Sequence, residues 1–271
     1  ILVMARKLER GEWLLLFSVA CLPLDRRPEP GVAVVTLSAD AGLSTGIATA
    51  DGWRITFDRF ALALGNARLT NDPAAQACSP YTDTQYFRIV DLVQSEPHTL
   101  STLHGLGACR LQFQLSGTPE DEPIVSHVGS DLERLMTTRS SDLFVQNRPI
   151  TVSVLGTAVR AEGAAGAAGP SPAVAFDWSF RAAFDYEFCD LPALQTGVAE
   201  AIEVQVHPRR LFHDSLDASA AVPRFGPYAA ANADDDAALT LDELAASPTE
   251  SGPFSTLGER LYLGLVPRLL T

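Results

Sequence analysis

Apolar and polar residues alternate along most of this chain, which is typical of strands that bury one face. The longest alternating row has seven apolar members, which are Phe176, Trp178, Phe180, Ala182, Phe184, Tyr186 and Phe188. This row predicts one long, half-buried strand. A row of aromatic residues can also be a sugar-binding platform, but strict period two on a long strand favours a hydrophobic core.

Shorter runs of the same kind predict the remaining strands, at residues 32–37, 53–64, 86–93, 99–103, 109–116, 150–154 and 202–206. The alternation changes phase at Asp58 and Arg59, which predicts a β-bulge or a change of partner strand. The Gly- and Ala-rich residues 163–172 predict a flexible hairpin connection. Together these patterns predict an all-β fold, an antiparallel β-sandwich domain over residues 32–218.

Helical signals are few, and most of them lie near the C-terminus. Ser130 with Glu133, and Thr256 with Glu259, have the spacing of a capping box. Three leucines recur at helical spacing after Thr256. Residues 219–271 are therefore expected to form a short C-terminal helical, EF-hand-like appendage.

The first 20 residues have the layout of a short signal peptide, because basic residues precede an apolar run from Trp13 to Ala20. Cys21 follows directly, and residues 18–21 resemble a bacterial lipobox, in which the Cys receives the lipid. The resemblance implies an exported lipoprotein of the cell envelope, periplasmic or in the outer membrane, with outer-membrane lipid as partner of the acylated Cys21. Residues 21–31 are polar and Pro-rich, as expected of a tether. The alternative is an N-terminal helix or strand packed on the domain.

Charge and cysteine content narrow the possible partners and compartment. The 33 acidic and 20 basic residues give a formal charge of −13, which disfavours nucleic acid as a partner. An exported compartment would let two of Cys78, Cys109 and Cys189 form a disulfide. All three pairings stay open, and the inward phase of Cys109 in its strand favours a buried free thiol at that position.

The segment 232–243, NADDDAALTLDE, resembles an EF-hand calcium loop in the spacing of its oxygen ligands. The resemblance implies a weak, structural calcium site whose ligands are Asn232, Asp234, Asp236, the Ala238 carbonyl, Thr240 and a bidentate Glu243. Thr240 and Glu243 also have capping-box spacing for the following helix. Asn replaces the usual first Asp, and Ala237 replaces the Gly of the sharp turn, so low affinity is expected. A solvated acidic loop that keeps an ancestral shape is the competing interpretation.

Catalytic signatures such as GxSxG and HExxH are missing from the sequence, which favours a non-catalytic protein with a binding or structural role. Two alternatives stay open. One is a periplasmic β-sandwich that handles a transition metal through His98, His104 or His127 with Met136. The other is an exported hydrolase of unrecognised type. His213, beside acidic residues, is expected in a capped turn more than in a metal site.

The order of elements in the β-body carries a further resemblance. DGWRITFDRFALALGNARL is followed by RIVDL, a Gly-containing turn and RLQFQL. This order is similar to that of exported β-sandwich lipoproteins, with a distant likeness to the periplasmic, copper-binding methanobactin-partner family. The likeness implies a periplasmic β-sandwich, and no copper ligand carries over residue by residue.

Overall fold

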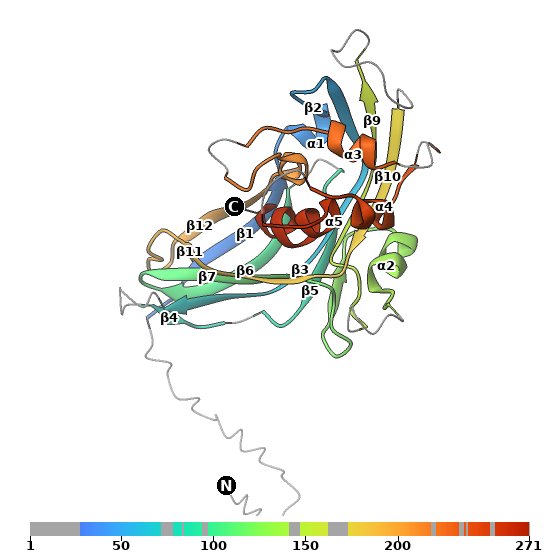
Figure 1. Cartoon of the computed structure of the whole chain (residues 1–271). Helices are drawn as coiled ribbons and strands as arrows, with labels where there is room; N and C mark the ends of the chain where they lie inside the picture. Colours follow the sequence, from blue (N-terminus) through green and yellow to red (C-terminus); the bar gives the residue numbers. More distant parts are fainter. Residues whose placement is uncertain are drawn as a thin grey trace, which may run out of the picture.

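The computed structural model contains two β-sheets and a series of short helices (Figure 1). It describes residues 28–71, 78–82, 84–93, 97–140, 147–161, 173–217, 221–232, 236, 238–249 and 253–270. The expected signal peptide, Cys21, most of the expected tether and the expected connection at 163–172 lie outside the described residues.

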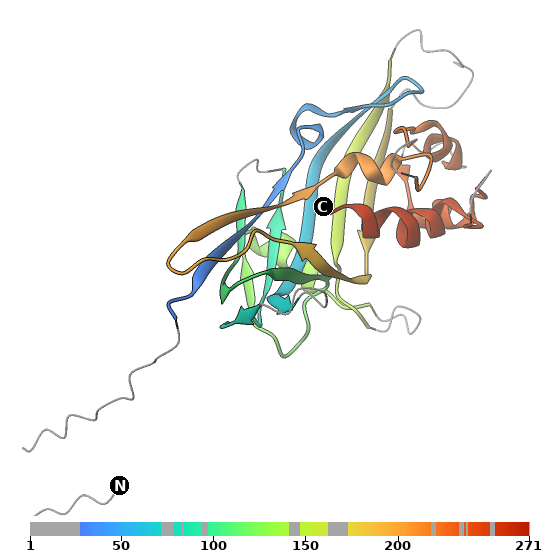
Figure 2. The same cartoon turned by 90° about the vertical axis from the view of Figure 1, so that its left-hand side faces the viewer.

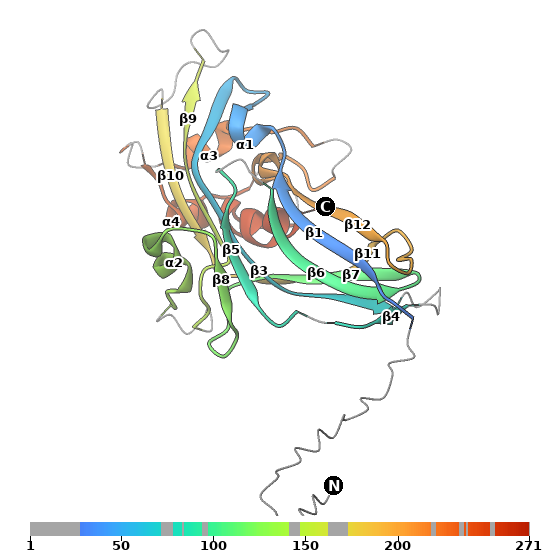
Figure 3. The same cartoon turned by 180° about the vertical axis from the view of Figure 1, so that it is seen from behind.

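The smaller sheet has four strands in the order β12, β1, β6, β4. β1 (Gly31–Ala39) pairs antiparallel with β6 (His98–Leu106) and parallel with β12 (Ala199–Val206). The short strand β4 (Ser79–Pro80) pairs antiparallel with β6. Buried and partly buried side chains alternate along most of β1, as period two requires of a strand with one face in the core. Figure 3 shows these strands running side by side.

The larger sheet is organised around β3 (Trp53–Asn71), a strand of 19 residues. Its first half pairs antiparallel with β9 (Val152–Arg160) and its second half with β7 (Cys109–Ser116). β5 (Phe87–Asp91) pairs with the middle of β3, opposite the ends of both partners. Because a strand has only two edges, β9 and β7 must lie end to end along the other edge of β3.

The aromatic row is divided between two strands, so the prediction of a single strand is wrong. β10 (Ala173–Phe180) pairs with β9, and β11 (Ala183–Asp190) pairs with β7. The ladder is interrupted at Arg181 and Ala182, where the chain leaves the end of β9 and reaches the end of β7. The predicted buried phase is confirmed across the break, since Trp178 is fully buried and Ala182 is 4% exposed.

The junction between β7 and β9 requires a very close approach of the backbone. A Cβ on Gly117 would lie 2.5 Å from the carbonyl oxygen of Pro149. Thr151 joins the junction to the neighbouring strands, because its backbone N–H donates to the Phe180 carbonyl at 2.7 Å and its hydroxyl donates to the Ala182 carbonyl. Thr151 therefore holds together the start of β9, the end of β10 and the start of β11. The sequence pattern alone predicted one continuous strand at this place.

Two irregularities bend β3. The register with β9 shifts between Phe57 and Arg59, which confirms the phase change predicted at Asp58 and Arg59. The register with β7 shifts between Gly65 and Arg68, and the alternation pattern did not indicate this second bulge. Asn66 lies inside it with a φ of +52°.

The expectation of a purely antiparallel arrangement is wrong, because the sheets are mixed. Parallel pairs join β1 with β12, β5 with β8 (Ile124–Ser126), and β10 with β13 (Ala238–Leu239), whereas β2 (Ile47–Ala48) pairs antiparallel with β3. Each parallel partner returns to its sheet after a long connection, as parallel pairing demands. Alternation along one strand carries no information about the direction of its neighbour.

Short helices complete the structure: α1 (Gly42–Thr45), α2 (Ser130–Thr137), η2 (Pro208–Phe212), α3 (Gly226–Ala231), α4 (Leu241–Ala246), α5 (Leu257–Glu259), η3 (Arg260–Leu265) and η4 (Val266–Arg268). Thr256 caps α5 as predicted, accepting a hydrogen bond from the Glu259 N–H at 3.1 Å. The predicted cap at Ser130 is wrong, because Gly129 takes the N-cap position of α2 and makes no side-chain cap. No helix in the described ranges is long and apolar enough to cross a membrane.

One hydrophobic core joins both sheets and the C-terminal helices. Figure 2 shows these helices lying beside the long strands of the larger sheet. The centre of the core is an aromatic cluster formed by Phe57, Phe176, Trp178, Phe212, Phe225 and Tyr228. A smaller core under α2 includes Met136, which is fully buried.

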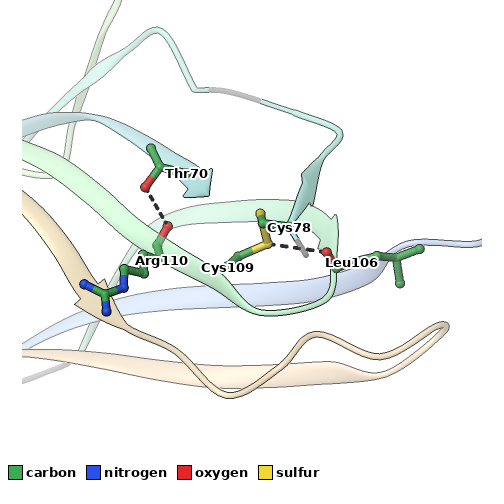
Figure 4. The surroundings of a disulfide bond; sticks show 5 residues. All are labelled: Thr70, Cys78, Leu106, Cys109 and Arg110. Atoms are coloured by element: carbon green, nitrogen blue, oxygen red, sulfur yellow. Dashed lines mark hydrogen bonds between the residues drawn. A yellow bond between two sulfur atoms is a disulfide. The ribbon is translucent and has the colours of Figure 1, made fainter. Parts of the chain in front are cut away.

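A disulfide bond between Cys78 and Cys109 joins the two sheets (Figure 4). Cys78 directly precedes β4 in the smaller sheet, and Cys109 begins β7 in the larger one. The interpretation of Cys109 as a free thiol is therefore wrong, although its predicted burial is correct. Among the described cysteines Cys189 is free, and burial together with the neighbouring Asp190 raises its pKa, which disfavours the reactive thiolate.

Candidate calcium loop

The segment that resembles a calcium loop lies between two short helices, as expected. α3 ends at Ala231, and α4 begins at Leu241. Asp234 and Ala237 fall outside the described residues, whereas the other predicted ligands, Asn232, Asp236, Ala238, Thr240 and Glu243, are described. The helix–loop–helix order predicted from the ligand spacing is thus present around the loop.

The preceding helix is fixed to the β-body by a carboxylate distant in sequence. Asp51, in the turn before β3, accepts hydrogen bonds from the N–H groups of Phe225 at 3.1 Å and Gly226 at 2.6 Å. Backbone N–H groups at a helix start otherwise lack partners, and a negative charge there interacts favourably with the helix dipole. The sequence analysis missed Asp51, because no local spacing connects it to a helix more than 170 residues away.

The centre of the loop is joined to the larger sheet. Ala238 and Leu239 form β13, which pairs in parallel with Ala175 and Phe176 of β10. Leu239 is 1% exposed, and its carbonyl accepts a hydrogen bond from the indole Nε1 of Trp178 at 3.0 Å. The position expected to be the apolar anchor of the loop therefore contacts the main aromatic core directly.

The end of the loop forms the capping box that was predicted. The Thr240 Oγ1 accepts a hydrogen bond from the Glu243 N–H at 3.2 Å. The Glu243 Oε2 accepts bonds from the Thr240 N–H and hydroxyl, both at 2.8 Å. Because these bonds occupy one carboxylate oxygen, bidentate binding of calcium by Glu243 requires that it exchange them for the cation.

The first predicted ligand has an unusual environment. Asn232 is only 5% exposed, and neither its Oδ1 nor its Nδ2 has a hydrogen-bond partner among the described residues. A buried amide without partners costs about 1–3 kcal/mol, and such groups in proteins normally bind a partner or an ion. Asp236, by contrast, accepts a bond at its Oδ1 from the Ala238 N–H at 2.8 Å. The side-chain amide oxygen of Asn232, Oδ1, is therefore available to a cation.

Acidic side chains within the described ranges do not form a metal site by themselves. No group of three or more His, Cys, Asp or Glu residues there is arranged to hold a metal ion. Backbone and amide oxygens can add calcium ligands, and Asp234 lies outside the described ranges. A calcium site in this loop would therefore depend on the neutral ligands Asn232, Thr240 and the Ala238 carbonyl. It would also depend on the carboxylates of Asp234, Asp236 and Glu243.

Two of the histidines considered for a transition metal lie near each other. The ring centroids of His98 and His127 are 5.9 Å apart, and the His98 Nε2 is buried without a partner. The His127 Nε2 contacts the Arg88 guanidinium at 2.5 Å. Burial, together with the charges of Arg88 and His98, lowers the pKa of His127, which favours the neutral form of this imidazole.

The other two residues of that hypothesis do not extend the histidine pair into a larger cluster. His104 is on the same strand as His98 but six positions further on, about 20 Å away at the usual strand rise. Met136 is fully buried in the smaller core. The structure therefore offers two neighbouring imidazoles and not a four-residue site.

The turn that contains His213 is a capped turn, as predicted. The Asp214 carboxylate accepts bonds from the Val222 N–H at 3.0 Å and from the Arg224 Nε at 2.8 Å. Burial alone would raise the pKa of Asp214, but these two donors outweigh it and lower that pKa. Burial, with Arg209 and Arg210 next in effect, lowers the pKa of His213. Asp214 is thus fully engaged as a structural acceptor.

Comparison with known proteins adds no relative: no known family, no curated protein and no solved structure matches the chain.

Proposed function

We propose that this protein is an exported, non-catalytic lipoprotein with a binding or structural role, whose loop at 232–243 binds calcium weakly and fastens the C-terminal helices to the β-body. The buried, unpartnered side chain of Asn232 is the observation that supports this most. A coordinating cation would give its Oδ1 the partner that it lacks.

Three contacts explain how occupancy of the loop would reach the rest of the molecule. Asp51 fixes the start of α3, β13 pairs with β10, and the Trp178 indole binds the Leu239 carbonyl. A cation that orders the loop would therefore stabilise the packing of α3 and α4 on the aromatic core. Binding to the folded state alone raises stability by RT ln(1 + [L]/Kd).

Weak affinity is expected for this site. The first ligand is a neutral amide, and Ala237 stands at the position where the calcium-loop pattern usually has Gly. Glu243 must also give up its bonds to Thr240. A dissociation constant of about 10⁻⁴–10⁻³ M, the range of extracellular calcium modules, matches these costs.

Export and lipidation are part of the same proposal. The Cys78–Cys109 disulfide is typical of proteins from oxidising compartments, which supports a location in the cell envelope, periplasmic or in the outer membrane. We interpret the two sheets, which share one core, as the layers of a β-sandwich. Cys21 would carry the lipid that anchors the protein in the outer membrane.

Calcium binding is tested by melting curves at increasing calcium, with magnesium at equal concentrations as a comparison. The wild type should gain several degrees at calcium well above Kd and less with magnesium. Glu243→Gln should remove the gain. Glu259→Gln is the matched control, because Glu259 occupies the same position of another Thr-capped helix outside the loop, and it should keep the gain.

Calorimetry at several millimolar calcium provides the independent measurement. Absence of both heat and a melting shift would refute the calcium site. A shift that Glu243→Gln and Glu259→Gln abolish equally would assign the effect to general helix stability and would also refute the site.

Lipidation is tested separately by Cys21→Ala in the producing cell. The variant should lose lipid labelling and leave the membrane fraction, whereas Cys189→Ala, which changes a cysteine within the folded body, should leave both unchanged. Unaltered fractionation of Cys21→Ala would exclude the anchor.

A transition-metal role is the second candidate, favoured by the His98–His127 pair and the buried Nε2 of His98. Two imidazoles suit copper or zinc, although the contact from Arg88 to His127 places a positive charge beside them. Elemental analysis of the purified protein should detect stoichiometric metal that His98→Ala removes. Metal-free protein that does not take up copper or zinc would eliminate this candidate.

A further inference from the structure

A polar cavity lies where β3 and β7 pair, on the part of the larger sheet that does not carry the calcium loop. Its volume is about 400 Å³, within the usual range for small-molecule sites. All the residues that line it are polar, and they include Asn66, Arg68, Gln85, Gln112, Gln114 and Glu122. Among the described residues this lining is predominantly polar, which suits a ligand that is bound by hydrogen bonds.

A bulge in β3 shapes this cavity. Asn66 and Ala67 lie between Gly65 and Arg68, while only one residue of β7 lies opposite. The φ of +52° at Asn66 is a left-handed conformation that costs about 1 kcal/mol outside Gly. Thr84 holds the bulge in place, because its N–H and hydroxyl donate to the Ala67 carbonyl at 3.2 and 2.6 Å. Bulges of this kind re-aim side chains and are common beside functional sites.

Hydrogen bonds between the lining side chains orient them and leave further groups available. The Asn66 Nδ2 donates to the Gln114 Oε1 at 2.9 Å, and the Arg68 Nε donates to the Gln112 Oε1 at 3.0 Å. Within the described residues the Asn66 Oδ1, the Gln114 Nε2 and the terminal nitrogens of Arg68 make no further bond. The wall therefore presents fixed donors next to fixed acceptors.

Glu122 adds an acceptor that lacks a donor. Its Oε2 is buried and has no hydrogen-bond partner in the described part of the chain, which is costly for a carboxylate oxygen. A ligand hydroxyl in the cavity would supply the missing donor. Glu122 and Arg68 carry opposite charges, so the lining has no strong preference for an anion or a cation.

We propose that this cavity binds a neutral, polyhydroxylated ligand, specifically a mono- or disaccharide. Each sugar hydroxyl is both a donor and an acceptor, as is each side-chain amide of the wall. An anion in the cavity would be repelled by Glu122, and a cation would be repelled by Arg68. An apolar molecule would leave the side-chain amides without hydrogen-bond partners. Sugar binding extends the calcium proposal to a second, independent site, and neither depends on the other.

The test is saturation-transfer NMR and calorimetry on the folded protein with glucose, galactose, mannose, N-acetylglucosamine and maltose, each up to tens of millimolar. At least one sugar should bind. Gln114→Ala and Glu122→Gln should each weaken that binding about tenfold, which corresponds to one hydrogen bond with a polar or charged partner.

Gln195→Ala and Glu200→Gln are the matched controls, because both residues lie outside the cavity lining, and they should bind as the wild type does. Melting temperatures of all four variants identify any that fail to fold, and Gln85→Ala, an exposed lining residue, then replaces the failed variant. Glutamate serves as the anionic probe and spermidine as the cationic probe. The proposal is overturned if no sugar binds, or if one of these charged probes binds instead. It is also overturned if the cavity variants bind sugar as tightly as the controls.

Discussion

Two segments are attached to the larger sheet in different ways. One is the edge of the smaller sheet at β4, where a disulfide forms the junction of the two sheets, and the other is the C-terminal loop at 232–243. At the junction, the Cys78–Cys109 bond joins β4 to β7 covalently, and Cys109 is buried whereas β4 is exposed. At the loop, Tyr228 and Leu239 pack in the shared core, and polar contacts from Asp51 and Trp178 are added to that packing. The disulfide at the junction forms in an oxidising compartment and requires no ligand. The loop contains the buried amide of Asn232, which has no partner among the described residues, so a ligand can stabilise the loop.

The largest expected effect concerns the residue that contacts both the core and the loop. Trp178→Ala should lower the free energy of unfolding by about 3–5 kcal/mol, because it empties a fully buried aromatic site. Trp178→Phe keeps most of the ring but loses the bond to the Leu239 carbonyl, so about 1–2 kcal/mol is expected. Denaturant unfolding measures both, and a Trp178→Phe variant as stable as the wild type would show that the contact with the Leu239 carbonyl contributes nothing.

Removal of the disulfide should be next in size. The bond closes a loop of 31 residues in sequence separation, and the chain-entropy estimate for such a loop is about 3–4 kcal/mol. The double variant Cys78→Ser, Cys109→Ser should therefore unfold at lower denaturant than the wild type, and a reductant should bring the wild type close to the variant. Cys189→Ser should keep the full response to reductant. A wild type that is insensitive to reductant would contradict the pairing.

A smaller effect is expected at the start of α3. Asp51→Ala removes the acceptor of the Phe225 and Gly226 N–H groups, and the loss should be about 1–2 kcal/mol, as for other helix caps. Asp58→Ala, at an exposed carboxylate on the neighbouring strand, serves as the control and should cost less than half as much. Thermal unfolding distinguishes them, and equal costs would show that the cap does not hold the helix.

The smallest expected effect concerns the threonines that cap α4 and α5, and it separates the calcium loop from an ordinary helix cap. Thr240→Ala and Thr256→Ala each remove an N-cap hydroxyl, and each should cost about 1 kcal/mol without calcium. With calcium, Thr240→Ala should lose part of the melting shift, since it also removes a predicted ligand, whereas Thr256→Ala should retain all of it. Identical shifts in the two variants would place Thr240 outside the site.

Sequence reasoning was successful where the signal is local. The alternation at Phe176, Trp178 and Phe180 predicted their burial, and the spacing of Thr240 and Glu243 predicted the capping box. The phase change at Asp58 predicted the first bulge of β3. Each of these features is decided within a few residues, by period-two side-chain direction or by a side chain that reaches its own backbone.

It was not successful where distant segments meet. The break at Arg181 exists because β9 and β7 end there, and nothing in the row itself records the ends of its partners. The polar cavity lining depends on the bulge in β3, where the register with β7 shifts. The Asn66 side chain, inside this bulge, contacts Gln114 of β7. The cap from Asp51 to Gly226 likewise joins residues that have no common local pattern.

By itself, the amino-acid sequence determined the mainly β composition of the fold, the inward face of its strands, and the order of helix, acidic loop and helix near the C-terminus. Only the tertiary structure decided the mixed direction of the sheets, the Cys78–Cys109 pairing and the burial of Asn232 without a partner. The physical reason is that periodicity and capping are interactions between near neighbours, whereas strand pairing, cysteine proximity and the burial of a polar group depend on which distant surfaces pack together.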